Sequence, residues 1–168
     1  MSPSTYKKYS REDQRALAVW AADCAERVLP LFESAYPEDD RPRKAIEACR
    51  RWVGTGVFKM ADIRGASLTA HAAAREAKEN EAACCAAHAA GQAVATAHVP
   101  QHAYGSAYYA LKAVAANDPA NAEDKVAQER RWQSDHIPDA LREEVMERIR
   151  VQKTGRRMVI KIQKGPGF

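Results

Sequence analysis

Residues 82–111 read AACCAAHAAGQAVATAHVPQHAYGSAYYAL, which is 30 residues without a single Asp, Glu, Lys or Arg. A stretch this long and uncharged is typical of a membrane span or of a helix that other helices enclose. Three histidines, two glutamines and Pro100 lie within it, and its apolar residues are mostly alanine, so its insertion into lipid would be costly. We therefore expect the buried centre of a helical bundle, with no membrane association.

The composition of the whole chain favours the same fold. Of the 168 residues, 34 are alanine, whereas only 3 are Trp, 3 are Phe and 6 are Tyr. Alanine has the best helix propensity and the smallest side chain, so helices rich in it can approach closely. The counts of 8 Gly, 8 Pro and 4 Cys exclude collagen, a disordered chain and a disulfide-rich scaffold. The sequence predicts a soluble, all-α, single Ala-rich multi-helix bundle.

Hydrophobic periodicity and capping signals predict about six to seven helices. Pro100 either begins a helix or kinks one long helix, which is why the number is open. Beyond Gly155, the run Met158–Ile162 is compatible with a short strand. We expect one helical bundle domain over residues 1–150 and a basic C-terminal extension over 151–168. The expected helices cover residues 13–35, 41–54, 60–80, 81–97, 99–117 and 119–134, and a last one begins at Pro138.

Charge is distributed unevenly along the chain. The formal net charge is +4, but residues 150–168 hold six basic residues and no acid, which leaves about −2 for the first 149. A basic tail can bind an anionic partner such as nucleic acid, or it can be a solvated terminus. A nucleic-acid-associated protein is therefore one alternative function. Its candidate contacts are Arg150, Lys153, Arg156, Arg157, Lys161 and Lys164.

The histidines of the uncharged stretch suggest a second alternative, a metalloenzyme. His98 and His102 are four residues apart, a spacing that places two imidazoles on one helical face, and His88 precedes them. However, the Glu that follows the first His in metalloproteases is missing, and Pro100 lies between the two. The simpler interpretation is that these are core histidines, which hydrogen-bond to the backbone or to Gln92, Tyr104, Tyr108 and Tyr109.

Motifs that announce other chemistries are missing from the sequence. There is no G-x-x-x-x-G-K-[ST] phosphate loop, no G-x-S-x-G nucleophile elbow and no C-x-x-C pair. The four cysteines fit reduced, buried thiols of a cytoplasmic protein, and residues 1–15 show no secretory signal. We expect no catalysis and no cofactor.

Four segments resemble a bacterial family. DCAERVLPLFE at 23–33 and DDRPRKAIEA at 39–48 carry the resemblance, together with AHAAAR at 70–75 and AGQAVATAHV at 90–99. The family is labelled putative immunity protein and is similar to the fifth-numbered immunity family of polymorphic toxin systems. The resemblance covers about residues 13–116. It implies a cytoplasmic protein that binds and neutralises a cognate toxin without catalysis.

The resemblance assigns no contact residue, so charge supplies the candidates. Glu33, Glu38, Asp39 and Asp40 form an acidic corner that could face a basic toxin, with ordinary loop solvation as the alternative. Ala-rich helices often pack in pairs, which makes a homodimer a further expectation.

Overall fold

The structure, a computed structural model, describes residues 6–168. It confirms the all-α prediction, since the described chain forms seven α-helices followed by only one small antiparallel hairpin. The elements are α1 (Arg11–Glu33), α2 (Arg41–Thr55), α3 (Met60–Glu76), α4 (Glu81–Ala95), α5 (His102–Asn117), a 3-10 turn (Pro119–Asn121), α6 (Ala122–His136), α7 (Asp139–Arg148), β1 (Ile149–Thr154) and β2 (Arg157–Ile162).

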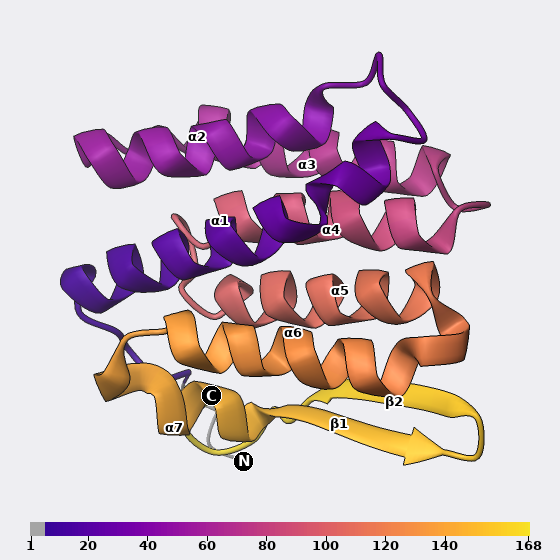
Figure 1. The fold of residues 1–168 in the computed structure, drawn as a ribbon. Helices are drawn as coiled ribbons and strands as arrows, with labels where there is room; N and C mark the ends of the chain where they lie inside the picture. Colours follow the sequence, from indigo (N-terminus) through magenta and orange to yellow (C-terminus); the bar gives the residue numbers. More distant parts are fainter. Residues whose placement is uncertain (1–5) are drawn as a thin grey trace.

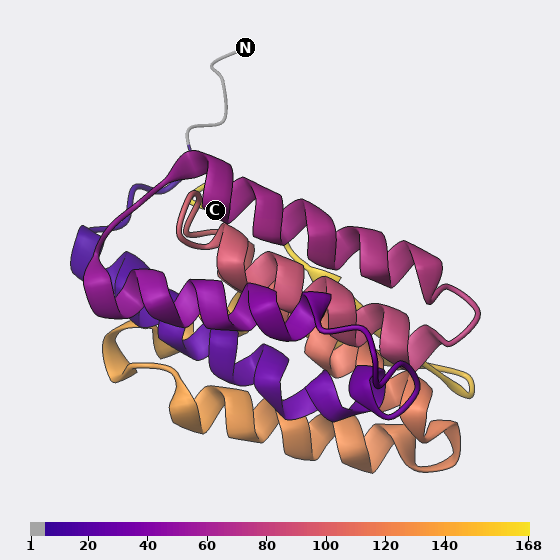
Figure 2. The same ribbon diagram turned by 90° about the horizontal axis from the view of Figure 1, so that it is seen from above.

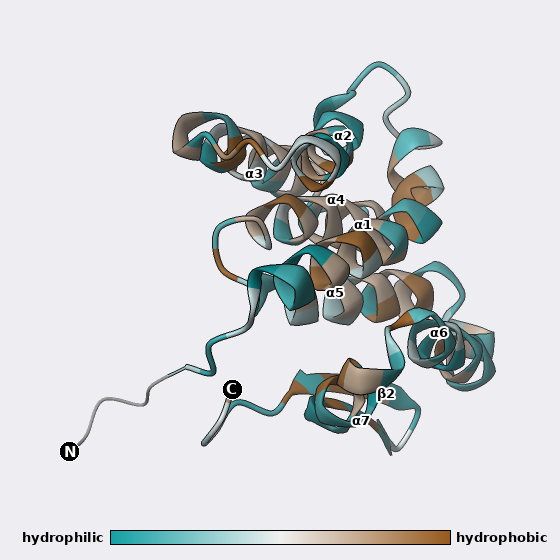
Figure 3. Ribbon diagram, turned by 90° about the vertical axis from the view of Figure 1, so that its left-hand side faces the viewer, coloured by the Kyte–Doolittle hydropathy of each residue, from teal (hydrophilic) through white to brown (hydrophobic). Residues whose placement is uncertain are grey.

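The helices and the hairpin stack in four tiers, and each of the upper three is a near-parallel pair of helices (Figure 1). The pair α2 and α3 lies at the top, α1 and α4 come next, and α6 and α5 form the third tier. The hairpin and α7 make the tier at the bottom. Viewed along the helices, the hydrophilic residues gather on the outer helices, most clearly on α6 and α7 (Figure 3). The top and bottom tiers are therefore the broad surfaces on which partners can be sought.

Helix α4 occupies the centre of the stack. It packs against α1, α2, α3 and α5, and nine of its 15 residues are buried, six of them alanine. Because alanine has a small side chain and Gly91 has none, little side-chain volume projects from α4, and four helices can pack close to it. The uncharged stretch thus forms α4 and α5, as the sequence predicted for a bundle centre. No helix within residues 6–168 is both long and apolar enough to cross a membrane.

Polar side chains inside the stack bond to backbone carbonyl groups of neighbouring helices. The Ser106 hydroxyl donates to the Ala21 carbonyl oxygen at 2.7 Å, and the Trp20 indole N–H donates to that of Gln133 at 2.9 Å. The Gln133 amide donates to the Ala107 carbonyl oxygen at 3.1 Å. Because a buried polar group without a partner is costly, these bonds fix how α1, α5 and α6 are placed relative to each other.

The ends of several helices differ from the prediction. Helix α1 continues past Pro30 but ends at Glu33, and α3 ends at Glu76 rather than near residue 80. Helix α4 ends at Ala95, and α5 begins only at His102, because a turn that contains Pro100 separates them. Proline has no N–H to donate and its ring crowds the preceding turn. Pro30 is nevertheless tolerated inside α1, whereas Pro100 lies in a turn between two helices, so the structure excludes one long helix here.

The C-terminal segment is more ordered than the prediction of one short strand. Residues 149–154 pair with 157–162, from Ile149 opposite Ile162 to Thr154 opposite Arg157, and Gly155 takes φ +62° in the turn. The predicted boundary between residues 150 and 151 falls inside β1, whose first residue, Ile149, is part of the core. Phe168 is buried as well, and the Gln101 amide donates to its carbonyl oxygen at 3.0 Å.

The closeness of the central helices leads to a stability prediction. A Cβ atom added at Gly91 would lie 2.7 Å from Nε2 of His71, so Gly91→Ala should lower the free energy of unfolding by about 1–3 kcal/mol. In the control Gly65→Ala the new methyl group on α3 meets nothing within 4 Å. That variant should gain about 0.5–1 kcal/mol, since alanine is the better helix former. Urea unfolding followed by circular dichroism measures both, and equal effects would contradict the close packing.

Candidate functional site

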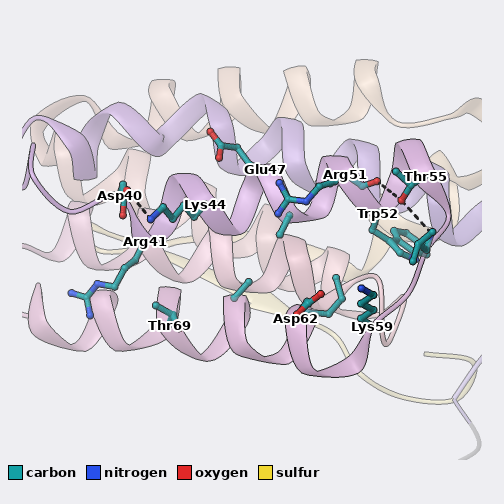
Figure 4. A pocket seen from close by; sticks show the side chains of 14 residues that line it. Asp40, Arg41, Lys44, Glu47, Arg51, Trp52, Thr55, Lys59, Asp62 and Thr69 are labelled. Carbon is teal, nitrogen blue, oxygen red and sulfur yellow. Dashed lines mark hydrogen bonds and ion pairs between the residues drawn. The ribbon is translucent and has the colours of Figure 1, made fainter.

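A groove runs along the top tier between α2 and α3 (Figure 4). Seen from above, the two helices lie beside one another over α4 (Figure 2). Its volume is about 800 Å³, which falls in the range of small-molecule and peptide sites. Asp40, Arg41, Lys44, Glu47, Ala48, Arg51, Trp52, Thr55, Val57, Lys59, Asp62, Ile63, Ala66 and Thr69 line it.

Local sequence explains why the groove is open. Gly56 ends α2 with φ +69°, and its N–H donates to the Trp52 carbonyl oxygen at 2.8 Å. A residue with a Cβ rarely adopts this left-handed conformation, so glycine sets the turn that leads into α3. Ala48 and Ala66, which face each other from the two helices, are too small to fill the space between them. Trp52 and Ile63 are buried below the opening.

One end of the groove is held by an ion-pair network. The Arg41 guanidinium lies 2.6 Å from a carboxylate oxygen of Asp39 and 2.5 Å from one of Glu76, which connects α2 to the end of α3. The hydrogen bonds from Arg41 lower the pKa of Asp39 below its usual value. Lys44 pairs with Asp40 at 3.1 Å. This end is therefore close to neutral and geometrically fixed.

The other end carries charges that no described residue neutralises. Arg51 and Lys59 form no ion pair within residues 6–168, and neither do the carboxylates of Glu47 and Asp62. Figure 4 shows Glu47 and Arg51 on α2, with Asp62 on α3 and Lys59 just before it. An apolar floor with charged residues at its edge resembles a protein interface, which has an apolar centre and a polar rim.

Large apolar side chains are exposed beside this end. Val57, Phe58 and Met60 are 60%, 39% and 44% exposed. Val57 and Phe58 lie in the segment that joins α2 to α3, and Met60 is the first residue of α3. Phe58 stacks on the His98 ring with 6.2 Å between the ring centroids, so it is held in place. Neighbouring exposed apolar residues of this size mark an interaction site more often than scattered ones do.

Trp52 adds an unused hydrogen-bond donor. Its side chain is only 4% exposed and lines the groove, yet its indole nitrogen has no hydrogen-bond partner among the described residues. Buried tryptophan N–H groups usually have one. Of the groove residues, only Asp40 was singled out from the sequence as a candidate contact, because the proximity of the others depends on how α2 and α3 pack.

The predicted acidic corner is largely paired within the protein. Glu33 pairs with Arg43 at 2.6 Å, and Asp39 and Asp40 pair with Arg41 and Lys44 as described above. Only Glu38 forms no ion pair within residues 6–168. The corner lies at the neutral end of the groove, of which Asp40 and Arg41 are part. It is therefore not a bare acidic patch.

Each of the three histidines considered for a metal contacts a different neighbouring side chain. His88 Nδ1 is 2.6 Å from Nδ1 of His71, His102 Nδ1 is 2.7 Å from the Gln92 side-chain oxygen, and His98 stacks on Phe58. Within residues 6–168 no three His, Cys, Asp or Glu side chains gather in a way that could hold a metal ion. Hydrogen bonds inside and at the edge of the core account for His88 and His102.

The cysteines are free thiols in a protonating environment. Burial raises the pKa of Cys49 to about 12 and that of Cys85 to about 11, and it also raises the pKa of Cys24 and Cys84. Because the thiolate is the reactive form, none of the four is activated as a nucleophile.

The basic residues of the C-terminal segment lie at the opposite side of the molecule from the groove, on the hairpin (Figure 1). Lys153 pairs with Glu123 at 2.7 Å. The remaining five, Arg150, Arg156, Arg157, Lys161 and Lys164, form no ion pair within the described chain.

The fold and the groove together define an all-α protein with an open, mixed-charge surface at one end. The family model described as Imm-5 like putative immunity protein matches residues 7–140, which is most of the chain. The chain belongs to this family, as the resemblance of its first two helical segments predicted. No curated protein matches the chain, and no solved structure does.

The half-buried histidines lead to a prediction about pH. Burial lowers the pKa of His71 to about 4, and it also lowers the pKa values of His88 and His102, whereas an unfolded histidine titrates near 6.5. Below about pH 7 the unfolded chain therefore binds protons that the folded chain does not, so the free energy of unfolding decreases as the pH is lowered. We expect a loss of about 1–2 kcal/mol per strongly shifted histidine between pH 7.5 and 5, after allowance for partial exposure.

Urea unfolding at the two pH values measures this loss, with His71→Gln as the comparison. The variant should lose less stability than the original chain between pH 7.5 and 5, because one depressed pKa is removed. A midpoint that is the same at both pH values in the original chain would contradict the buried, neutral state of these rings.

Proposed function

We propose that this protein acts as an immunity protein, binding a cognate toxin protein in the cytoplasm and blocking it without catalysing a reaction. The family match over residues 7–140 is the observation that carries the proposal. The structure adds a suitable surface, because the α2–α3 groove combines an apolar floor, exposed apolar side chains and available charges of both signs.

The groove fits a helix or an extended segment of the partner. Such segments bind by placing a few apolar anchors in a groove while charges at its edge set the register. Trp52 and Arg51 belong to the residue types that dominate binding energy at interfaces, and both line the groove. Arg51 and Lys59, which line the groove and form no ion pair within residues 6–168, would pair with carboxylates of the partner.

The acidic corner keeps a smaller part in this proposal. Asp40 lies at the end of the groove and could still steer a basic toxin during association. Its pairing with Lys44 limits the field that it produces, so we place the main contact at the Val57–Met60 end.

Capture of the tagged full chain from a lysate of its own host, with nuclease and about 0.5 M salt, tests the proposal, since surface charge pairs are largely screened at that salt. We expect a protein partner that arrests growth when it is expressed alone and is harmless when this chain is co-expressed. A captured protein that is not toxic, or a toxic one that co-expression leaves toxic, would contradict the immunity function.

Charge placed on the exposed apolar segment tests the groove separately. Val57→Asp and Phe58→Asp should weaken binding of the captured toxin at least tenfold and reduce protection, because an unpaired carboxylate would be buried in the interface. Val57 lines the groove, and Phe58 follows it in the exposed apolar segment. Leu68→Asp is the matched control, since Leu68 is 55% exposed on α3 and belongs neither to the groove nor to that segment. Calorimetry gives the affinities, and circular dichroism checks that all three variants are folded.

The same variants test the role of the α2–α3 groove independently of the immunity function. Loss of protection in the control as well as in the groove variants, or in neither, would reject the groove while leaving the immunity function in place.

A further inference from the structure

The β1–β2 hairpin has two different faces. Its antiparallel register places Ile149 opposite Ile162 and Val151 opposite Ile160, and these side chains pack against the core beside α5. Because successive residues of a strand point to opposite sides, the residues between them face outward. The outward pairs are Arg150 with Lys161, Gln152 with Val159 and Thr154 with Arg157.

This outward face is cationic and its charges are available. Arg150, Lys161 and Arg157 form no ion pair within residues 6–168, and Arg150 donates only to the neutral side-chain oxygen of Gln163, at 3.1 Å. A hollow of about 400 Å³ on this face is lined by Arg150, Gln152, Val159, Lys161, Ile162 and Gln163, without any acidic residue.

A second cationic hollow lies at the tip of the hairpin, where the inner side of the strands meets α5. Arg156 and Arg157 meet Lys112 of α5 around a space of about 410 Å³ whose floor includes Met158 and Ile160. The Lys112 ammonium group lies 5.3 Å from the centroid of the Tyr108 ring. Glu81 is the one carboxylate that lines this hollow, against three cations.

Carboxylates of α7 border the cationic face beside Arg150. Glu143, Glu144 and Glu147 of α7 line a hollow beside Arg150, so an anionic partner is repelled from that direction. It is attracted along the length of the hairpin, from Lys161 to the tip. We call this strip, formed by Arg150, Lys161, Arg157 and Arg156 of the hairpin, the cationic strip.

The length of the strip indicates the kind of anion. Arg157 and Lys161 are four residues apart on β2, which is about 13 Å along a strand. A single phosphate or carboxylate cannot contact both ends, whereas a linear polyanion can. Duplex DNA carries one negative charge per about 1.7 Å of its axis. Residues 149–162 contain no aromatic side chain on which the bases of a single strand could stack, which favours a duplex.

We propose that the cationic strip binds the phosphate backbone of duplex nucleic acid without regard to base sequence. The proposal is independent of toxin binding, because the hairpin lies outside the family match at residues 7–140 and at the far end of the stack from the α2–α3 groove (Figure 1). Phosphate contacts position a protein on a duplex but do not read its sequence.

Fluorescence anisotropy with the full chain and a labelled 20-base-pair duplex of mixed sequence tests the proposal. With three to four phosphates neutralised, the logarithm of the binding constant should fall with the logarithm of the salt concentration with a slope of about −2.7 to −3.6. The dissociation constant should therefore rise about 40- to 150-fold from 50 to 200 mM salt. A second duplex of unrelated sequence should bind equally.

The variant Arg157→Gln/Lys161→Gln should bind at least tenfold more weakly at 50 mM salt, with a slope smaller by about 1.8. The control Arg51→Gln/Lys59→Gln removes the same charge from the α2–α3 groove and should leave both values nearly unchanged. All four side chains line open surface hollows, and thermal melting checks the fold.

Three results would overturn the proposal. One is no binding of the duplex at 50 mM salt, and another is an equal loss of binding in the two double variants. The third is tight binding of poly-L-glutamate without binding of the duplex, which would assign the strip to an acidic protein surface instead.

Discussion

Close approach of the backbones around α4 is the constraint on which the structure depends. Helix α4 presents mostly alanine to α1, α2, α3 and α5, and the backbones come so near that the rings and amides of neighbours occupy the space a methyl group would need. His71 lies against Gly91, and the Gln92 side chain lies against Gly105 of α5 in the same way. Since dispersion between closely packed atoms is small per pair but large in sum, a core poor in bulky residues gains its stability from proximity.

The position of both candidate surfaces follows from this centre. Because α1, α4, α5 and α6 fill the middle tiers, α2 and α3 are left to cover the top and the hairpin to cover the bottom (Figures 1 and 3). Each outer layer buries one of its faces against the middle tiers and exposes the other to solvent. Ion pairs such as Arg41 with Asp39 and Glu76 then fix the outer helices at their ends, which leaves the remaining groove charges available.

The sequence predicted the helices and the buried centre, because both depend on local periodicity and on the absence of charge over residues 82–111. The turn around Pro100 and the pairing of the hairpin were harder to predict from the sequence. Whether proline begins or breaks a helix depends on neighbours, and strand pairing between 149–154 and 157–162 is stabilised by packing on the core. The groove could not be predicted, since Arg51 and Asp62 are brought together only by tertiary structure. The acidic corner was visible as charge, but its partners Arg41, Arg43 and Lys44 were not assigned to each carboxylate.

A centre built from alanine and glycine also determines where this chain can vary over evolutionary time. At a position such as Ala86 or Ala90, both completely buried, nearly every substitution adds volume that no neighbour can accommodate. The exposed faces of α2, α3 and the hairpin have no such limit. Mutational drift and selection for new partners are therefore directed to the top and bottom of the stack, while the inner tiers remain a fixed frame. A lineage that must follow a changing antagonist can in this way alter its recognition residues one at a time without losing the fold.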